Sequence, residues 1–415
     1  MWNSKNHNKA FWNVILGFAI VVLLVGMLFG YTHITQRQEA EDQALMELAN
    51  QEKLENQTTK EESYKILEED YQKDMSTVAE YLPGIVCWGD VLTEGAASGI
   101  SYPKTLQLLI NKYLVSPYDF RSTVDNPFQY TRVDWKQFTT EIPVVNMGTG
   151  EESTQTILGR SGVAPYVVSK DFTVPEDCSP VSIRFTGFDG QAAAPLTMGD
   201  LEFNPVTING LEGRITWDPD AHLYSSDGEY YFTRSTAGEE LVIEKGAEII
   251  PASSALYRDY ISVIFIGSYG QYKDAEELVS HVRLMLSRQQ KNKDRFIIIG
   301  NYTGNGQSSD FYDHFASLMT QEYGDRFINF RKYLLNEALP EYGIKPTNKD
   351  TSNIGMGRIP ESLLVTGSHT ELQAFLYEKL GQMVFERMDS LGYFDEFREE
   401  LKVLSVEELD AAALQ

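Results

Sequence analysis

Five short apolar runs, separated by amphipathic helical patterns, constrain the fold of this chain more than any other feature. The runs lie at 84–89, 142–148, 260–267, 295–302 and 326–330, and the helical patterns lie near 102–114, 153–160, 273–289, 309–322 and 371–392. Strands that are apolar on both faces indicate a parallel sheet that is covered on both sides. The alternation therefore predicts an α/β fold, a three-layer α/β/α sandwich with a five-stranded parallel sheet. In such sheets, ligands bind beyond the carboxyl ends of the strands.

Residues 171–256 interrupt this alternation. They are rich in β-branched and aromatic residues and contain turn signals such as Asn209-Gly210. Short strands bounded by such turns are typical of antiparallel sheets. We therefore predict a small inserted all-β domain at 171–256. It divides the α/β domain into a first part at 81–170 and a second part at 257–395, and an acidic tail follows at 396–415.

An apolar run from Phe11 to Tyr31 has about the roughly 20 residues that a helix needs to cross a bilayer. Lys5 and Lys9 precede the run and acidic residues follow it, so the positive-inside rule places residues 1–10 in the cytoplasm and the bulk of the chain outside the cell. A cleaved signal peptide is the alternative, but its apolar region would be shorter and would be followed by an A-x-A site. We predict a single-pass protein of the cell membrane, anchored through residues 11–31, with a charged helical stalk at 32–80.

Charge and cysteine content narrow the possible partners. The formal net charge is −25 at pH 7, which repels nucleic acid and argues against it as a partner. The two cysteines are Cys87 and Cys178. Cys87 lies in an apolar run, which favours a buried free thiol, although a disulfide is permitted outside the cell. No Cys/His cluster has the spacing of a metal site, so we expect neither a metal nor a cofactor.

Four short motifs follow the apolar runs or close the α/β region. They are Gly89-Asp90-Val91-Leu92-Thr93, the segment 145–153, Ile266-Gly267-Ser268-Tyr269-Gly270, and the segment 357–369 that ends in Thr366-Gly367-Ser368-His369. In this order they resemble the conserved blocks of the SGNH/GDSL hydrolases, in which some bacterial members carry an inserted β domain. The resemblance covers residues 81 to 394. It implies the SGNH, or flavodoxin-like, form of the three-layer sandwich.

The resemblance also implies a set of catalytic positions, and most of them are substituted here. The family uses a serine nucleophile, a glycine N–H and an asparagine side chain in the oxyanion hole, and an Asp–His pair. The residues at these positions are Val91 for serine, Glu151 for glycine, Tyr269 for asparagine, Thr366 for aspartate and His369 for histidine. A shift of one residue would place Gly150 at the glycine position instead. Only His369 matches the family pattern.

These substitutions predict that the ordinary ester-cleaving mechanism is lost. Removing the serine or histidine of a serine hydrolase costs on the order of a millionfold in kcat. Thr366 cannot stabilise an imidazolium as a carboxylate does. Glu151, if it faces the pocket, would place negative charge where an oxyanion should develop. Whether the chain is an enzyme stays open, because a nucleophile outside the family pattern could replace the serine.

The other polar residues of the motifs have structural explanations. Thr93 and Ser153 follow strands and open helices, which predicts helix capping. Asp90 can stabilise its turn, and Ser268 and Ser368 are loop residues whose hydroxyls usually bond to the backbone. The candidate residues for lining a ligand-binding cleft are Asp90, Gly150, Ser268 and Ser368.

The leading hypothesis is a membrane-anchored extracytoplasmic protein without catalysis, which binds or scaffolds a cell-envelope glycan or a partner protein. It is favoured because the nucleophile, oxyanion and acid positions are all substituted while the surrounding motifs are kept. The alternative is an active esterase or deacetylase that acts on acylated envelope carbohydrate. A structural subunit of a membrane complex is a third possibility.

Overall fold

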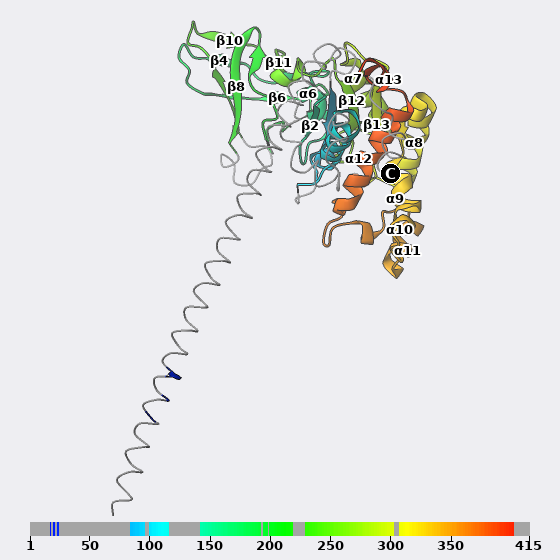
Figure 1. Cartoon of the computed structure of the whole chain (residues 1–415). Coiled ribbons are helices and arrows are strands. Elements are labelled where there is room, and N and C mark those ends of the chain that lie inside the picture. Colours follow the sequence, from blue (N-terminus) through cyan, green and yellow to red (C-terminus); the bar gives the residue numbers. More distant parts are fainter. Residues whose placement is uncertain are drawn as a thin grey trace, which may run out of the picture. The chain divides into compact units, whose positions relative to one another are not determined.

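The five apolar runs form one parallel sheet in the computed structural model (Figure 1). Its strands are β1 (Ile85–Gly89), β2 (Val144–Gly148), β12 (Ile261–Phe265), β13 (Phe296–Ile299) and β14 (Phe327–Ile328). They lie in the order β14-β13-β12-β1-β2, and every neighbouring pair is parallel. The predicted α/β fold with a five-stranded parallel sheet is confirmed.

The structure describes residues 84–95, 99–115, 142–191, 194–197, 199–218, 229–302 and 307–401, together with helical positions 17, 20, 23 and 24. The chain divides into two units, residues 1–69 and 70–415, and the elements discussed below all belong to the second. The rest of the predicted membrane helix at 11–31, the stalk at 32–80 and the end of the tail at 402–415 lie outside the described residues. Among the residues that are described, no helix combines the length and the apolar character needed to cross a bilayer.

Alternate side chains of the parallel strands enter two separate cores, so both faces of the sheet are covered. On one face, Cys87 and Phe265 pack with α3 (Tyr102–Ile110), α9 (Phe330–Asn336) and α12 (Ala374–Ser390). On the other face, Trp88 and Ile264 pack with α6 (Thr154–Ser161), α7 (Ala275–Ser287) and α8 (Ser309–Tyr323). Period-2 alternation of buried residues is what a strand between two helical layers requires.

The five long helices agree with the predicted helical patterns, but α3 continues differently from the prediction. The pattern near 102–114 divides into α3 and a π-helical turn at Asn111–Val115. Outside the five patterns lie α9, α2 (Val91–Glu94), α10 (Ala338–Glu341) and α11 (Asn348–Gly355), with 3₁₀ turns at Ala252–Ser254, Gly324–Arg326 and Glu361–Leu363. The start of the acidic tail belongs to α13 (Asp395–Leu401).

The segment between β2 and β12 contains an antiparallel region with its own core. Seven strands form one sheet in the order β5-β9-β8-β7-β11-β3-β6, and β10 and β4 form a two-stranded sheet. The strands are β3 (Tyr166–Val168), β4 (Phe172–Val174), β5 (Val181–Ile183), β6 (Phe185–Thr186), β7 (Val206–Ile208), β8 (Leu211–Asp218), β9 (Glu229–Arg234), β10 (Leu241–Ile243) and β11 (Glu248–Pro251). The antiparallel region begins at Tyr166, before the predicted start at residue 171, because β3 pairs with β11 and β6.

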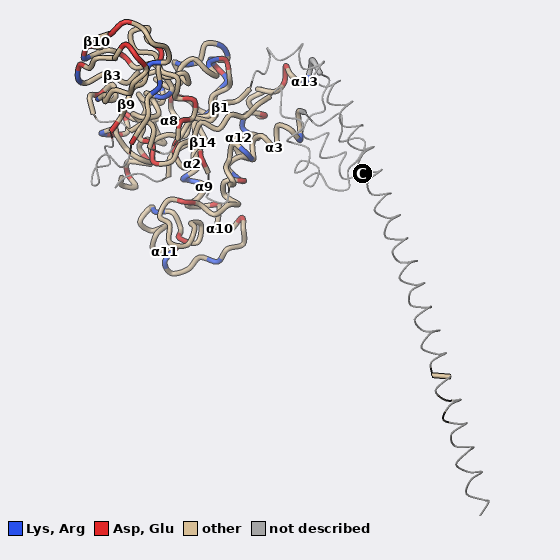
Figure 2. Tube along the Cα trace, turned by 90° about the vertical axis from the view of Figure 1, so that its left-hand side faces the viewer, with Lys and Arg blue, Asp and Glu red and all other residues tan. Residues whose placement is uncertain are grey.

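Several hydrogen bonds join the antiparallel region to the α/β part. The hydroxyl of Tyr166 donates to the carbonyl of Thr156 in α6 at 2.7 Å, and the hydroxyl of Ser253 donates to the carbonyl of Arg160 at 2.6 Å. Acidic and basic residues are interspersed over the described elements (Figure 2). The charge at any one site therefore depends on the individual side chains at that site.

Candidate functional site

Hydrogen bonds join the loops that follow β1, β2 and β12 at the carboxyl ends of the strands, and another joins the loop after β13 to the segment before α12. The backbone N–H of Ser268 donates to Asp90 Oδ2 at 3.2 Å, which joins the loops after β12 and β1. Ser153 Oγ donates to the side chain of Gln271, which joins the loops after β2 and β12. The hydroxyl of Tyr302, after β13, donates to the carbonyl of Thr370 at 2.7 Å. The first three motifs thus belong to loops that hydrogen bonds connect, at the edge where parallel sheets bind ligands.

Asp90 is a fully buried residue with a structural task. Its Oδ1 accepts from the N–H of Leu92 at 3.0 Å and so caps α2, while its Oδ2 holds Ser268. Burial raises the pKa of Asp90 to about 6, and the hydrogen bonds from Leu92 and Ser268 oppose this shift. Both carboxylate oxygens are therefore engaged in holding the turn, as the sequence predicted for this residue.

Two glycines allow α2 to lie directly on the strand ends. A Cβ at Gly89 would be 2.0 Å from Thr93 Oγ1, and a Cβ at Gly148 would be 2.2 Å from the backbone nitrogen of Glu94. Non-bonded atoms do not approach each other this closely, so both positions require glycine. Thr93 is not the helix cap that the sequence suggested, because Asp90 takes this role and Thr93 Oγ1 lies 3.3 Å from the hydroxyl of Tyr102.

Val91 is the first residue of α2, immediately after the Asp90 cap. Its partly buried side chain packs against the core that contains α3, α9 and α12. An aliphatic side chain has no atom that can attack a carbonyl or exchange a proton. At the position where the resemblance expects a nucleophile, the chain has a packing residue.

Tyr269 lies half-buried among acidic residues. The pKa of Tyr269 is raised by burial and, in decreasing order, by the negative charges of Asp90, Glu151 and Glu94. An oxyanion at this place would meet the same repulsion. The surroundings of Tyr269 are therefore opposite to those of an oxyanion hole, which uses donors aimed at the developing negative charge.

Glu151 is exposed and has a positive φ of 60°. This left-handed conformation costs a non-glycine residue roughly 1–2 kcal/mol, whereas glycine adopts it freely. Gly150 does not have a positive φ. The backbone at Glu151 is thus one that glycine fits best.

His369 and Thr366 lie in an exposed loop, and His369 has no hydrogen bond to any described residue. The hydroxyl of Tyr302, after β13, bonds to Thr370 in the same loop. The hydroxyl of the neighbouring Ser368 accepts from the N–H groups of Thr370 and Glu371, at 3.2 and 2.8 Å. Ser368 thus stabilises its own turn, as predicted.

The predictions for Ser153 and Ser268 have different outcomes. Ser153 caps α6, where its hydroxyl accepts from the N–H of Thr156 at 3.2 Å, so the predicted capping is confirmed. Within the described part of the chain, the buried hydroxyl of Ser268 has no backbone partner, contrary to the prediction. It lies close enough to Asp90 to lower the pKa of that carboxyl.

A buried ion pair lies next to the second motif, and no feature of the sequence predicted it. Arg160 Nη2 lies 2.7 Å from Glu152 Oε2, with both side chains almost fully buried, and it also donates to the carbonyl of Met147 at 2.7 Å. Burial raises the pKa of Glu152, and Arg160 opposes that shift. A glutamate and an arginine eight residues apart, across a helix start, give no pairing signal in a single sequence.

The sequence motifs also did not indicate Glu94, Tyr302 and Tyr377 as residues of this site. The charge of Glu94 raises the pKa of Tyr269. The pKa of the buried Tyr302 is raised first by burial and then by Tyr377, Asp90 and Tyr269. Tyr302 directly follows the fourth apolar run, so the rule that ligands bind at carboxyl ends could have identified it. Within the described ranges, no group of three or more His, Cys, Asp or Glu residues is arranged to hold a metal ion.

In comparisons with known proteins, the chain matches no family model, no curated protein and no solved structure.

Proposed function

We propose that this chain is a membrane-anchored extracytoplasmic protein with an SGNH-like α/β/α fold, which binds or scaffolds at the cell envelope without hydrolysing esters. Numbered within the sheet, the strand order β2-β1-β12-β13-β14 is 2-1-3-4-5, which is the order of flavodoxin-like folds. Helices on both faces and the bonded motif loops support the same fold. The apolar run at 11–31 supports the anchor.

The placement of Val91 is the observation that carries the absence of catalysis. The strand–turn–helix segment that would present a nucleophile is intact, with Asp90 capping α2 and glycines at both strand ends. At the first position of that helix the side chain is aliphatic and packed against the core. The negative surroundings of Tyr269 disfavour an oxyanion in the same place.

The chemistry around Tyr269 favours a glycan over an anionic polymer as the ligand. The ring offers an apolar surface with a polar tip, and Glu94 and Glu151 offer acceptor oxygens for hydroxyl or amino groups. An anionic polymer would be repelled by these carboxylates. A neutral or amino-sugar envelope polysaccharide fits this chemistry best.

Hydrolysis by the full chain tests the catalytic part of the proposal. Purified protein is incubated with p-nitrophenyl acetate and with a fluorophosphonate probe, and no turnover above buffer and no labelling are expected. A parallel sample carries Val91→Ser, Glu151→Gly, Tyr269→Asn and Thr366→Asp, and a gain of hydrolysis there would support the assignment of the four positions. Turnover by the unaltered chain that His369→Ala abolishes would refute the non-catalytic function.

Cosedimentation with envelope polysaccharide tests the ligand. Tyr269→Ala is expected to weaken binding at least tenfold, whereas Tyr342→Ala, which removes an aromatic residue that is 40% exposed elsewhere, should leave it unchanged. Equal binding by the two variants would show that the Tyr269 surface is not the glycan site.

Cys178 provides a test of the orientation in the membrane. Of the two free cysteines, Cys178 is exposed and Cys87 is buried. In intact cells that express the full chain, a membrane-impermeant maleimide is expected to label Cys178, and Cys178→Ser is expected to remove the signal. Labelling that requires permeabilised cells would contradict the extracytoplasmic location.

A further inference from the structure

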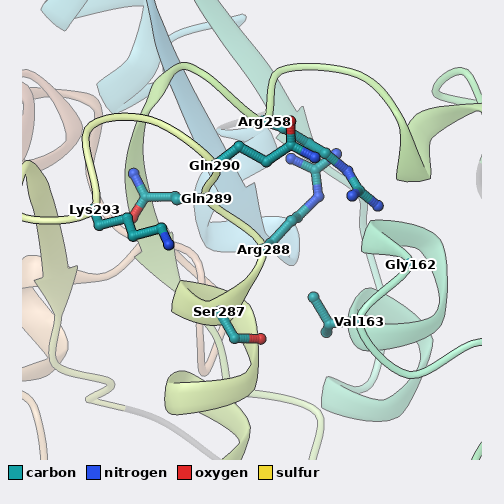
Figure 3. A pocket seen from close by; sticks show the side chains of 8 residues that line it. All are labelled: Gly162, Val163, Arg258, Ser287, Arg288, Gln289, Gln290 and Lys293. Carbon is teal, nitrogen blue, oxygen red and sulfur yellow. The ribbon is translucent and has the colours of Figure 1, made fainter.

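A cavity of about 490 Å³ lies at the opposite end of the parallel sheet, next to the amino ends of β12 and β13 (Figure 3). Its polar lining comes from two segments that precede these strands: Arg258 from one, and Ser287, Arg288, Gln289, Gln290 and Lys293 from the other. The N–H of Gln290 donates to the carbonyl of Arg258 at 2.9 Å, which holds the two segments together. Among the residues that the structure describes, no carboxylate lines the cavity.

Arg288 is the structural member of this group. It is 6% exposed, and its Nε and Nη2 donate to the carbonyls of Ser161 and Ser253 at 2.8 and 2.7 Å. Its guanidinium also lies 4.8 Å from the ring centre of Trp88. The helices α6 and α7 both end here, so Arg288 offsets the partial negative charge of helix carboxyl termini. Arg288 adds positive charge to the cavity, but most of its donors are engaged.

Arg258 and Lys293 have donors left for a ligand. Arg258 uses Nε to bond the carbonyl of Ser254 at 2.8 Å, and no bond of its two terminal nitrogens to a described residue is recorded. The exposed Lys293 has no recorded hydrogen bond or ion pair with the described part of the chain. Figure 3 shows Arg258 beside Arg288 at one side of the cavity and Lys293 at another.

The electrostatic surroundings of the cavity favour a negatively charged ligand. Burial, and after it the like charges of Arg258 and Arg160, lower the pKa of Arg288 to about 10. Of the two acidic residues next to the lining segments, Asp259 lies 3.8 Å from Lys291, and neither Asp259 nor Asp294 lines the cavity. In a chain of net charge −25, a cavity with three cations and no carboxylate is a local reversal of sign.

We propose that this cavity binds the phosphate group of a small soluble molecule. A guanidinium presents paired N–H donors that match phosphate oxygens, and an ammonium binds phosphate as a point charge. The volume lies within the roughly 300–1,000 Å³ that is usual for small-molecule sites. The bound phosphate would contact Arg258 and Lys293, with Arg288 behind them supplying charge.

This site is independent of the function proposed for the carboxyl edge. A strand of five residues, such as β12, spans about 16 Å at roughly 3.3 Å per residue, so Asp90 and Arg258 lie at opposite ends of the sheet. Loss of phosphate binding would not affect the hydrolysis, glycan or labelling results. Each proposal can fail while the other stands.

Titration of the full chain in detergent with inorganic phosphate and with pyrophosphate tests the site. Calorimetry is expected to show saturable binding that sodium chloride of matched ionic strength does not produce. Lys293→Glu should weaken binding at least tenfold without changing the melting temperature in the absence of phosphate, since Lys293 makes no recorded bond. Arg258→Gln should weaken it similarly, and Arg214→Gln, which removes an exposed arginine paired with Asp200, should not.

Either of two results would overturn the proposal. One is equal heats for phosphate and chloride at matched ionic strength, which would indicate ionic screening alone. The other is unchanged affinity in Lys293→Glu and in a folded Arg258→Gln, which would place any bound phosphate elsewhere on the protein.

Discussion

At the carboxyl ends of β1, β2 and β12, the charges that surround Tyr269 are acidic, whereas at the amino ends of β12 and β13 the cavity-lining charges are basic. Part of this difference belongs to the fold. Helices begin at the carboxyl edge, where Asp90 caps α2 and Asp274 caps α7, and helices end at the amino edge, where Arg288 bonds the last carbonyl of α6. Acids at helix starts and cations at helix ends both offset the helix dipole.

The charged residues that are not explained by the helix dipoles are more informative about ligand binding. Among the described residues, the side chains of Glu94 and Glu151 accept no N–H of a helix start, and Lys293 bonds no carbonyl of a helix end. Arg258 bonds the carbonyl of Ser254, at the end of a 3₁₀ turn, through Nε alone, so its terminal nitrogens remain. Each pair adds to the sign that its end already carries. We therefore assign ligand binding to these surplus charges, and stability to Asp90 and Arg288.

The largest effect is expected at Arg160, whose helix α6 connects the two ends. Arg160→Met leaves Glu152 buried without its partner, and the expected loss is about 3–5 kcal/mol of unfolding free energy. Urea denaturation measures it. Arg283→Met, at the more exposed pair with Glu322, should cost at most about 1 kcal/mol.

A double variant distinguishes an unpaired charge from lost packing. Glu152→Leu combined with Arg160→Met should be more stable than Arg160→Met alone, because no buried charge is left without a partner. If the single variant denatured at the same urea concentration as the unaltered chain, the pair would have no role in joining the two ends.

The pH dependence of stability is the second test, and it concerns Asp90 at the acidic end. A shift of its pKa from 3.8 to about 6 corresponds to about 3 kcal/mol. Between these values the unfolded chain has ionised Asp90 while the folded chain keeps the proton, so this group lowers stability as pH rises from about 4 to 6. Asp90→Asn removes that dependence.

The measurement is urea denaturation of both chains at several pH values from 4 to 7. The stability of Asp90→Asn relative to the unaltered chain should increase over this interval by up to about 3 kcal/mol. Substituting the exposed Asp325 by Asn controls for the loss of one surface carboxylate. A pH-independent difference would show that Asp90 is ionised throughout.

A third test breaks the contact between α2 and the strand ends. Gly148→Ala would force its Cβ against the backbone nitrogen of Glu94, at an expected cost of about 1–3 kcal/mol. Gly355→Ala is the control, since nothing lies within 4 Å of the added methyl group, and no loss is expected there. Equal melting temperatures for the two variants would contradict the close approach of α2.

The sequence predicted the strands of the parallel sheet well because they are buried on both faces. An apolar run such as 260–267 needs no partner to be recognised, and β12 occupies its centre. The start of the antiparallel region was placed too late, since β3 is identified by pairing with β11 rather than by its own three residues. Pairing over such a separation leaves no local signal.

The candidate site was predictable in its location but not in its contacts. The motifs placed Asp90 and Ser268 at strand ends, yet their bond joins residues 178 positions apart. The basic cavity was missed altogether. Arg258 and Lys293 lie in connecting segments before strands, where no motif or periodicity distinguishes a binding residue from a solvated one.

The smallest effect is expected at Glu151, and it separates backbone strain from charge at the acidic end. Glu151→Gly relieves the left-handed backbone and removes a negative charge beside Tyr269, whereas Glu151→Ala removes the charge but keeps the Cβ. Glycine should therefore exceed alanine in unfolding free energy by about 1 kcal/mol. The difference between alanine and the unaltered chain then reports the charge alone, and thermal denaturation resolves both steps. If alanine and glycine proved equally stable, the backbone at 151 would carry no strain.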